Sequence, residues 1–264
     1  MISALLKFFR VGRQEVRTME DYKILGNKVT AITSEQLNQE VKSIILQNRK
    51  ELILNTNVHG INLAQKHPWL KQFRNLAAIV HCDGAGVMLG LRILGLSVPC
   101  RITIHGWMAS LAELCVKNDF SMFFLGARPG IAELAAGNIR DRYPGLRIIG
   151  THHGYFEKTG KESDLVVSAI NKLRPDIVIV GFGMPIQEKW IKENWEKIDA
   201  HIFVPGGGCF NFLSGAMPTC PKWLANMGFE WLFRLASEPR RLFVRYVWGN
   251  SRFLLDVFKE KIAG

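Results

Sequence analysis

Short apolar runs alternate along the chain with longer stretches in which apolar residues recur every three or four positions, from about Tyr22 to Lys222. Runs of the first kind are typical of buried strands, and stretches of the second kind are typical of amphipathic helices. The predicted strands are 29–32, 51–55, 76–81, 121–125, 146–149, 176–180 and 201–204. The predicted helices are 34–47, 84–94, 108–117, 130–142, 163–173 and 186–196.

Regular alternation of strands and helices predicts an α/β fold with a mostly parallel, Rossmann-like sheet and helices on both faces. The helix 34–47 is expected to begin with Ser34 as its N-cap, because Glu35 and Gln36 follow in the first turn. We see no internal repeat and no low-complexity tract. Residues 1–20 are interpreted as an N-terminal extension and residues 21–222 as the α/β core.

The character of the chain changes after Pro221. Residues 223–264 are rich in aromatic and arginine residues and are predicted to form a helical appendage, broken into two helices at Pro239. This mixture suits a helix that lies on an anionic membrane surface. The alternative is a C-terminal helix that packs on the core and keeps its arginines in water.

Composition narrows the class of partner. The 264 residues carry a net charge of +11, which favours nucleic acid, anionic lipid or a phosphorylated substrate. No segment has the pattern of a secretory signal, and the charge-free run 202–221 contains glycines and prolines that make it poor material for a membrane helix. Five cysteines without C-x-x-C spacing indicate reduced thiols in a cytoplasmic protein that does not span the membrane.

Polar and glycine residues follow several of the predicted strands. Asn55 closes one strand, Gly181 and Gly183 follow another, and Gly207 follows a third. Ligands of open α/β sheets bind beyond the carboxyl ends of the strands, where glycines let backbone N–H groups approach a phosphate or a sugar. Taken singly, each glycine could be required only by the geometry of a tight turn and not by a ligand. Together they predict a site for a ligand the size of a nucleotide.

Two familiar phosphate motifs are incomplete. The segment 181–186 lacks the third glycine of the dinucleotide fingerprint, and the segment 154–161 has the wrong length for a P-loop. A simple NTPase or an NAD enzyme is therefore disfavoured. No Asp-x-Asp motif is present, so no metal and no other cofactor is expected. Without a metal, Arg234, Arg241 and Arg245 of the appendage would have to neutralise a leaving diphosphate.

Asp83 is the strongest candidate for a catalytic carboxylate, because it stands between an apolar strand and Gly84. It could take a proton from a substrate hydroxyl as a general base, or it could only cap the following helix. His152 and His153 form a second polar pair. Adjacent residues point in different directions and nothing is spaced to complete a metal site, so we interpret them as site-lining or surface residues.

The ordered motifs of the chain resemble those of the WecG/TagA/CpsF glycosyltransferases of bacterial surface-polysaccharide synthesis. The resemblance runs from Tyr22 to Tyr246 and rests on the following blocks: Asp83-Gly84, Pro129-Gly130, Tyr143-Pro144, Gly154-Tyr155-Phe156, Gly181-Phe182-Gly183-x-Pro185-x-Gln187-Glu188, Gly206-Gly207-Gly208-x-Phe210 and Glu230-Trp231-x-x-Arg234-x-x-x-Glu238-Pro239-x-Arg241. Each block alone is weak, but their order and spacing together are specific.

The resemblance implies a metal-independent, inverting transferase with a UDP-sugar donor and an undecaprenyl-diphosphate-linked sugar as acceptor. The donor sugar would be N-acetylmannosamine, its uronic acid, glucuronate or a similar hexose derivative. Asp83 matches the family's catalytic aspartate. Other family site residues fall on Asn57, Arg101 and Gln187. The appendage would bring Arg234, Arg241 and Arg245 to the site and would hold the enzyme on the inner face of the cytoplasmic membrane.

The chain departs from the family pattern at several positions. The segment 101–106 loses a glycine and an acid, Asn211 stands where aspartate is usual, and Thr219 begins Thr-Cys-Pro in place of Arg-Ala-Pro. Asn55 replaces a common threonine. These changes leave the identity of the donor sugar open, and a catalytically silent scaffold of a polysaccharide assembly remains an alternative. A nucleic-acid-binding protein is a further alternative, although the charge collects at one end of the chain.

Overall fold

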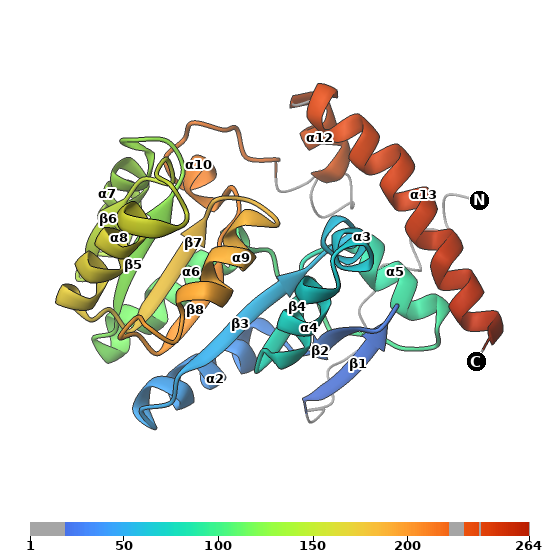
Figure 1. Cartoon of the computed structure of the whole chain (residues 1–264), viewed down its shortest axis with the longest axis horizontal. Helices are drawn as coiled ribbons and strands as arrows, with labels where there is room; N and C mark the ends of the chain where they lie inside the picture. Colours follow the sequence, from blue (N-terminus) through green and yellow to red (C-terminus); the bar gives the residue numbers. More distant parts are fainter. Residues whose placement is uncertain (1–18, 222–229, 238, 264) are drawn as a thin grey trace.

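Six parallel strands form the central sheet, in the order β4-β3-β8-β7-β5-β6 (Figure 1). The computed structural model describes residues 19–221, 230–237 and 239–263. The strands of the sheet are β3 (Glu51–Thr56), β4 (Ile79–Cys82), β5 (Ser121–Gly126), β6 (Arg147–His152), β7 (Ile177–Gly181) and β8 (Ile202–Pro205). The helices are α2 (Ser34–Leu46), α3 (Val58–Lys66), α4 (Pro68–Leu76), α5 (Ala85–Ile93), α6 (Ile104–Asn118), α7 (Ile131–Arg142), α8 (Gly160–Leu173), α9 (Ile186–Asn194), α10 (Cys209–Leu213), α12 (Glu230–Ser237) and α13 (Pro239–Ala263). The predicted α/β class with a parallel sheet is confirmed.

Helices cover both faces of the sheet, which explains why the central strands β7 and β8 contain no polar residue. In β7, Ile177 and Ile179 face one hydrophobic core, which also contains residues of α2, α6, α7 and α10. Val178 and Val180 face a second core with residues of α4, α8 and α9. Successive side chains of a strand point to opposite faces, so one short strand contributes to both cores.

A two-stranded antiparallel sheet packs against β4 without joining the main sheet. It pairs β1 (Glu20–Ile24) with β2 (Asn27–Ala31) through a turn at Leu25 and Gly26. Both turn residues have positive φ, 50° and 72°, as a tight two-residue hairpin turn requires. The predicted strand 29–32 is thus confirmed as β2, but it pairs with β1, which was not predicted, and not with a strand of the parallel sheet. A short hairpin strand has the same local apolar pattern as a strand of the main sheet.

Several boundaries differ from the predicted ones, and three of them are informative. The N-cap of α2 is Thr33, whose hydroxyl accepts from Gln36 N at 3.1 Å while the Gln36 side chain accepts from Thr33 N at 2.9 Å. This reciprocal capping box makes Ser34 the first residue of the helix and corrects its assignment as the cap. Helix α6 begins at Ile104 rather than at residue 108. Residue 76 ends α4, and the following strand begins only at Ile79.

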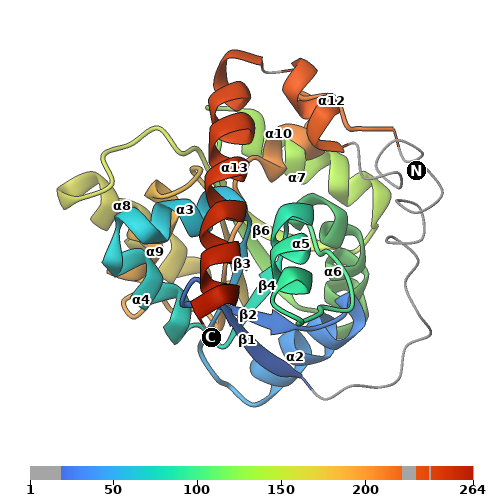
Figure 2. The same cartoon turned by 90° about the vertical axis from the view of Figure 1, so that its right-hand side faces the viewer.

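The C-terminal segment contains two helices, as predicted from Pro239, which is the first residue of α13. Figures 1 and 2 show α13 as a long helix on the outside of the fold, and it contacts α3 and α5. Phe253 and Val257 of α13 are fully buried in a third core that also contains Ile24 of the hairpin. One face of α13 thus packs on the core, as the alternative interpretation of a C-terminal helix packed on the core expected.

Candidate functional site

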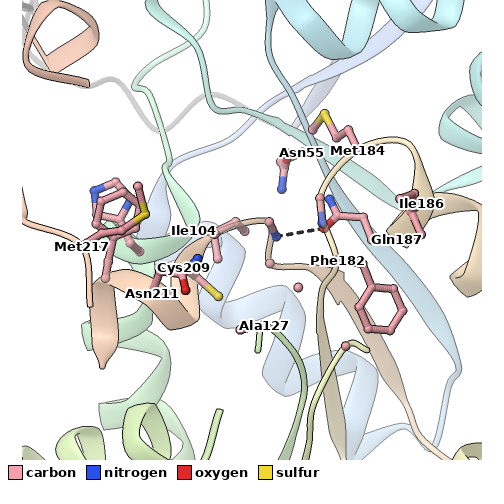
Figure 3. Close-up of a pocket in the computed structure, with 18 of the residues that line it drawn as sticks. Asn55, Ile104, Ala127, Phe182, Met184, Ile186, Gln187, Cys209, Asn211 and Met217 are labelled. Atoms are coloured by element: carbon pink, nitrogen blue, oxygen red, sulfur yellow. Dashed lines mark hydrogen bonds between the residues drawn. The ribbon is translucent and has the colours of Figure 1, made fainter. Parts of the chain in front are cut away.

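A cavity of about 770 Å³ opens at the carboxyl edge of the sheet. It lies where β3, β4, β7 and β8 end, which is the position of ligand sites in open α/β sheets. Figure 3 shows Asn55, Ala127, Gln187 and Asn211 around the same space. The cavity brings together most of the site residues expected from the sequence: Asn55, Asn57, Asp83, Gly181, Gly183, Gln187 and Gly207.

Asp83 lines the cavity directly beyond β4. Its backbone N–H donates to Thr56 O at 2.8 Å, which ties it to the end of β3. The N-cap of α5 is Gly84, so Asp83 lies one residue before the N-cap position at which the alternative interpretation placed it. The role of Asp83 as a general base stays a prediction. Gly84 packs closely on Asn57, since a Cβ added to Gly84 would lie 3.1 Å from the Cβ of Asn57. A glycine at this position therefore lets the two cavity-lining segments approach each other.

The two asparagines that follow β3 have different surroundings. Asn57 is the N-cap of α3, where its side-chain oxygen accepts from Gly60 N at 3.0 Å. The buried side chain of Asn55 donates through Nδ2 to Pro205 O at 2.9 Å, which links β3 to β8. Asn55 Oδ1 is also buried and has no hydrogen-bond partner in the described part of the chain. An unsatisfied acceptor in the cavity wall favours a ligand with a hydroxyl or N–H group.

Gln187 lies between the glycine turns that follow β7 and β8. Its Oε1 accepts from Gly183 N at 3.1 Å and from Gly207 N at 3.0 Å, and Figure 3 marks a hydrogen bond of this side chain. The turns themselves are close, because a Cβ on Gly181 would lie 2.9 Å from Gly207 O. Two of the N–H groups that we expected to face a ligand are thus already hydrogen-bonded to Gln187.

Comparisons with known proteins identify the family. The model of the glycosyl transferase WecG/TagA/CpsF family matches residues 22–264. The chain belongs to this family. It is also similar to proteins named N-acetylglucosaminyldiphosphoundecaprenol N-acetyl-beta-D-mannosaminyltransferase from Staphylococcus aureus strains MRSA252, MW2 and NCTC 8325. Each is 27% identical over 242 residues, which cover 91% of this chain and 91% of the relative. The chain is accordingly a glycosyltransferase of polysaccharide synthesis.

Two of the departures from the pattern of this glycosyltransferase family face the cavity. Ile104, where the family has glycine, is the first residue of α6, and Asn211 lies in α10; both line the cavity, as does the neighbouring His105. The ring of His105 lies 5.1 Å from that of Phe212. Thr219 is exposed and is not among the lining residues, and neither is the partly buried Arg101. The position of Arg101 leaves its proposed contact with substrate a prediction.

Lys158 lines the cavity and was missed in the sequence analysis. Its Nζ donates to Gly154 O at 2.7 Å and to Phe156 O at 2.6 Å, and it lies over the rings of Phe156 and Phe182 at 3.9 and 4.6 Å. Burial lowers the pKa of this amine, and nearby Glu162 opposes that effect. The lysine two residues after Gly-Tyr-Phe was the signal that could have indicated a cation beside a glycine turn.

The helices α12 and α13 close one side of the cavity of this glycosyltransferase. Phe233 lines it from α12, and Leu242 and Tyr246 line it from α13. Leu242 and Tyr246 are four residues apart, so they share one face of the helix. The predicted site residues Arg234, Arg241 and Arg245 belong to the same two helices, but their side chains lie outside the description. Their roles remain predictions.

The paired histidines lie outside the cavity lining. His152 Nδ1 lies 2.7 Å from His153 O, and the two rings are 4.5 Å apart. Within residues 19–221, 230–237 and 239–263, no three histidine, cysteine or acidic side chains are placed to hold a metal ion together. Across the same residues, none of the helices has both the length and the apolar content that a membrane span requires.

Proposed function

We propose that this glycosyltransferase moves a hexose derivative from a UDP-sugar to a sugar on undecaprenyl diphosphate. The observation that carries the proposal is the placement of Asp83 in a large cavity, beside the glycine turns at the carboxyl edge of the sheet. Relatives that share nearly the whole length of the chain are named as N-acetylmannosaminyltransferases acting on N-acetylglucosaminyl-diphosphoundecaprenol. N-acetylmannosamine, its uronic acid and glucuronate are the donor sugars to test first.

Asp83 acts as the general base in this proposal. Its carboxylate takes the proton of the acceptor hydroxyl, and the hydroxyl oxygen attacks the anomeric carbon from the face opposite UDP. The bond between that carbon and the β-phosphate oxygen breaks, and UDP leaves with the electron pair. A single in-line displacement of this kind inverts the anomeric configuration. Asn55 Oδ1 would accept a hydrogen bond from the sugar, because it is buried and lacks a partner among the described residues.

The leaving diphosphate needs positive charge, which we assign to the protein rather than to a metal. Lys158 is the described lysine of the cavity lining, and Arg128 is exposed at the same opening. Arg234, Arg241 and Arg245 would complete the set from α12 and α13. Fixed cations and N–H groups in a partly dry cavity stabilise the growing negative charge without reorganisation of solvent.

We also propose that α13 rests on the inner face of the bacterial cytoplasmic membrane. Large apolar side chains on its outer surface are exposed: Phe243, Val247, Trp248, Leu255, Phe258 and Ile262. Arg252 and Lys259, whose side chains are 67% and 78% exposed, accompany them. Exposed apolar residues mixed with basic ones are typical of helices that lie on anionic membranes. Phe233 and Tyr246 would then bring the cavity next to the lipid-linked acceptor.

The decisive experiment measures UDP release from a panel of UDP-sugars, with and without a lipid-diphosphate-sugar acceptor, in the presence of EDTA. We expect release from one donor that depends on the acceptor. Loss of that release in EDTA would contradict metal independence. Binding of UDP without turnover of any donor would favour the catalytically silent scaffold. Absence of UDP binding, together with salt-sensitive binding of random nucleic acid, would overturn the proposal in favour of the nucleic-acid alternative.

A further inference from the structure

The two glycine turns of the cavity are joined through a single oxygen atom. Gly183 N, which follows β7, and Gly207 N, which follows β8, both donate to Oε1 of Gln187. The backbone N–H of Gln187 donates in turn to Gly183 O at 3.1 Å, so this turn and the first turn of α9 are linked in both directions. The position of one carboxamide therefore sets the spacing of the two turns.

The two ends of that carboxamide are similar in shape, but Oε1 accepts hydrogen bonds and Nε2 donates them. A further contact is therefore needed to turn Oε1 toward the glycine N–H groups. Glu188 supplies the orientation: Nε2 of Gln187 donates to Oε1 of Glu188 at 3.0 Å. Because Oε1 of Glu188 accepts this hydrogen bond, it selects the NH₂ end of Gln187 and directs the oxygen end to the glycine N–H groups. A flipped carboxamide would place its NH₂ group against two N–H donors.

Glu188 is almost fully buried, with 1% of its surface exposed. Burial raises the pKa of its carboxyl above the ordinary range, and the positive charge of Arg74 opposes that rise. Arg74 is itself 0% exposed, and burial lowers the pKa of its guanidinium, with Glu188 opposing. Arg74 therefore acts on Glu188 through its charge and not through a hydrogen bond to Glu188 Oε2, which has no partner among the described residues.

The guanidinium of Arg74 lies close to three other parts of the fold. Its Nη1 donates to Thr56 Oγ1 at 3.1 Å, at the end of β3, and its Nη2 lies 3.8 Å from the Met184 sulfur between the glycine turn and α9. A Cβ on Gly60 would lie only 2.3 Å from Arg74 Nη2, so α3 leaves space for the guanidinium. The charged group thus reaches from α4 to the elements that carry Asn57 and Gln187.

We propose that Glu188, with Arg74 as its buried counter-charge, is a positioning residue for the donor site. It fixes the Gln187 carboxamide, which fixes the two glycine turns against which the UDP part of the donor binds. This inference rests on the proposed function, because the ligand of the turns is the UDP-sugar. A residue that only stabilised the fold would affect unfolding and would leave donor binding to the folded protein unchanged.

Glu188→Ala and Glu188→Gln test the proposal against Glu193→Ala, an exposed glutamate of the same helix. The first readout is hydrogen exchange of the Gly183 and Gly207 amides in the full chain, and the second is UDP affinity, measured where every variant is folded. Loss of one oriented hydrogen bond should accelerate exchange and weaken UDP binding by about tenfold in Glu188→Ala. Glu188→Gln should show a smaller change, because its amide can still accept from Gln187. Glu193→Ala should match the wild type.

A reversed pair supplies a rescue. In Gln187→Glu two carboxylates meet in a buried space, whereas Gln187→Glu with Glu188→Gln restores one carboxylate and one amide. The reversed pair should recover slow glycine exchange relative to Gln187→Glu alone. Unchanged exchange in Glu188→Ala, or faster exchange with unchanged UDP affinity, would overturn the positioning role. A wild type that binds no UDP would instead overturn the proposed function and the donor part of this inference, while exchange would still show whether Glu188 holds the turns.

Discussion

Phe253 of α13 packs directly on Gly90 of α5. A Cβ on Gly90 would lie 2.7 Å from Phe253 Cζ and 2.8 Å from Ile24 Cδ1. Because glycine has no side chain, Gly90 leaves room for α5, the hairpin of β1 and β2, and α13 to meet in one core. Because Leu242 and Tyr246 belong to the same helix as Phe253, this contact also fixes one wall of the cavity.

Gly90→Ala should lower the free energy of unfolding by about 1–3 kcal/mol, because the added methyl group overpacks this core. Urea unfolding measures the change. The matched control is Gly137→Ala in α7, where a Cβ would meet nothing within 4 Å. This control should raise stability by up to about 1 kcal/mol through the better helix propensity of alanine. Equal stability of the two variants would contradict the tight contact between Gly90 and Phe253.

Asp83→Asn should lower kcat by roughly two to four orders of magnitude, because a general base contributes that much to proton transfer. UDP affinity should change little, since the amide keeps the shape of the side chain. Kinetics with the identified donor and acceptor, together with calorimetric titration of UDP, separate the two effects. Asp164→Asn on α8 is the control for an acid outside the cavity lining. A near-normal turnover of Asp83→Asn would remove Asp83 from the mechanism.

Lys158→Gln should weaken UDP binding by about ten- to a hundredfold, the range expected for loss of a charged hydrogen-bond donor. The measurement is the Kd for UDP. Lys161→Gln supplies the control, because Lys161 is exposed in α8 and does not line the cavity. If both variants bound UDP like the wild type, Lys158 would serve only to hold the carbonyls of Gly154 and Phe156.

His81 should make the protein less stable in mild acid. Burial lowers the pKa of its imidazole from 6.5 to about 4, and the backbone of Ile102 partly offsets this. Between these two values the unfolded chain binds a proton that the folded chain does not, so the free energy of unfolding falls as the pH falls. The total loss is roughly 3 kcal/mol. His81→Leu should reduce the difference between urea unfolding at neutral and at acidic pH, whereas the exposed His67→Leu should keep it.

Trp248→Gln together with Phe258→Gln should weaken binding to anionic vesicles by more than about tenfold, because each side chain would otherwise leave water for the membrane interface. Co-sedimentation with vesicles containing phosphatidylglycerol measures this. Leu46→Gln with Leu165→Gln replaces two equally exposed leucines on α2 and α8 and should have no effect. Equal binding of both double variants would contradict a membrane contact through α13.

The sequence by itself determined the kinds of elements and which polar and glycine residues follow the ends of the strands. Apolar runs such as 176–180 identify strands that are buried on both faces, and strand ends identify the carboxyl edge to which Asp83 and Gly207 belong. Pro239 marked the break between α12 and α13. These inferences succeeded because burial, turn chemistry and the missing N–H of proline act over a few neighbouring residues.

Only the tertiary structure decided which segments meet. The local pattern of residues 29–31 does not distinguish a strand of the hairpin from a strand of the main sheet. Neither does it reveal that Arg74 and Glu188 share a buried space, or that Lys158 lines the same cavity as Tyr246. These contacts depend on the strand order β4-β3-β8-β7-β5-β6, which places distant parts of the chain side by side. The free energy of such an arrangement comes from packing of both faces of the sheet together, which no single segment encodes.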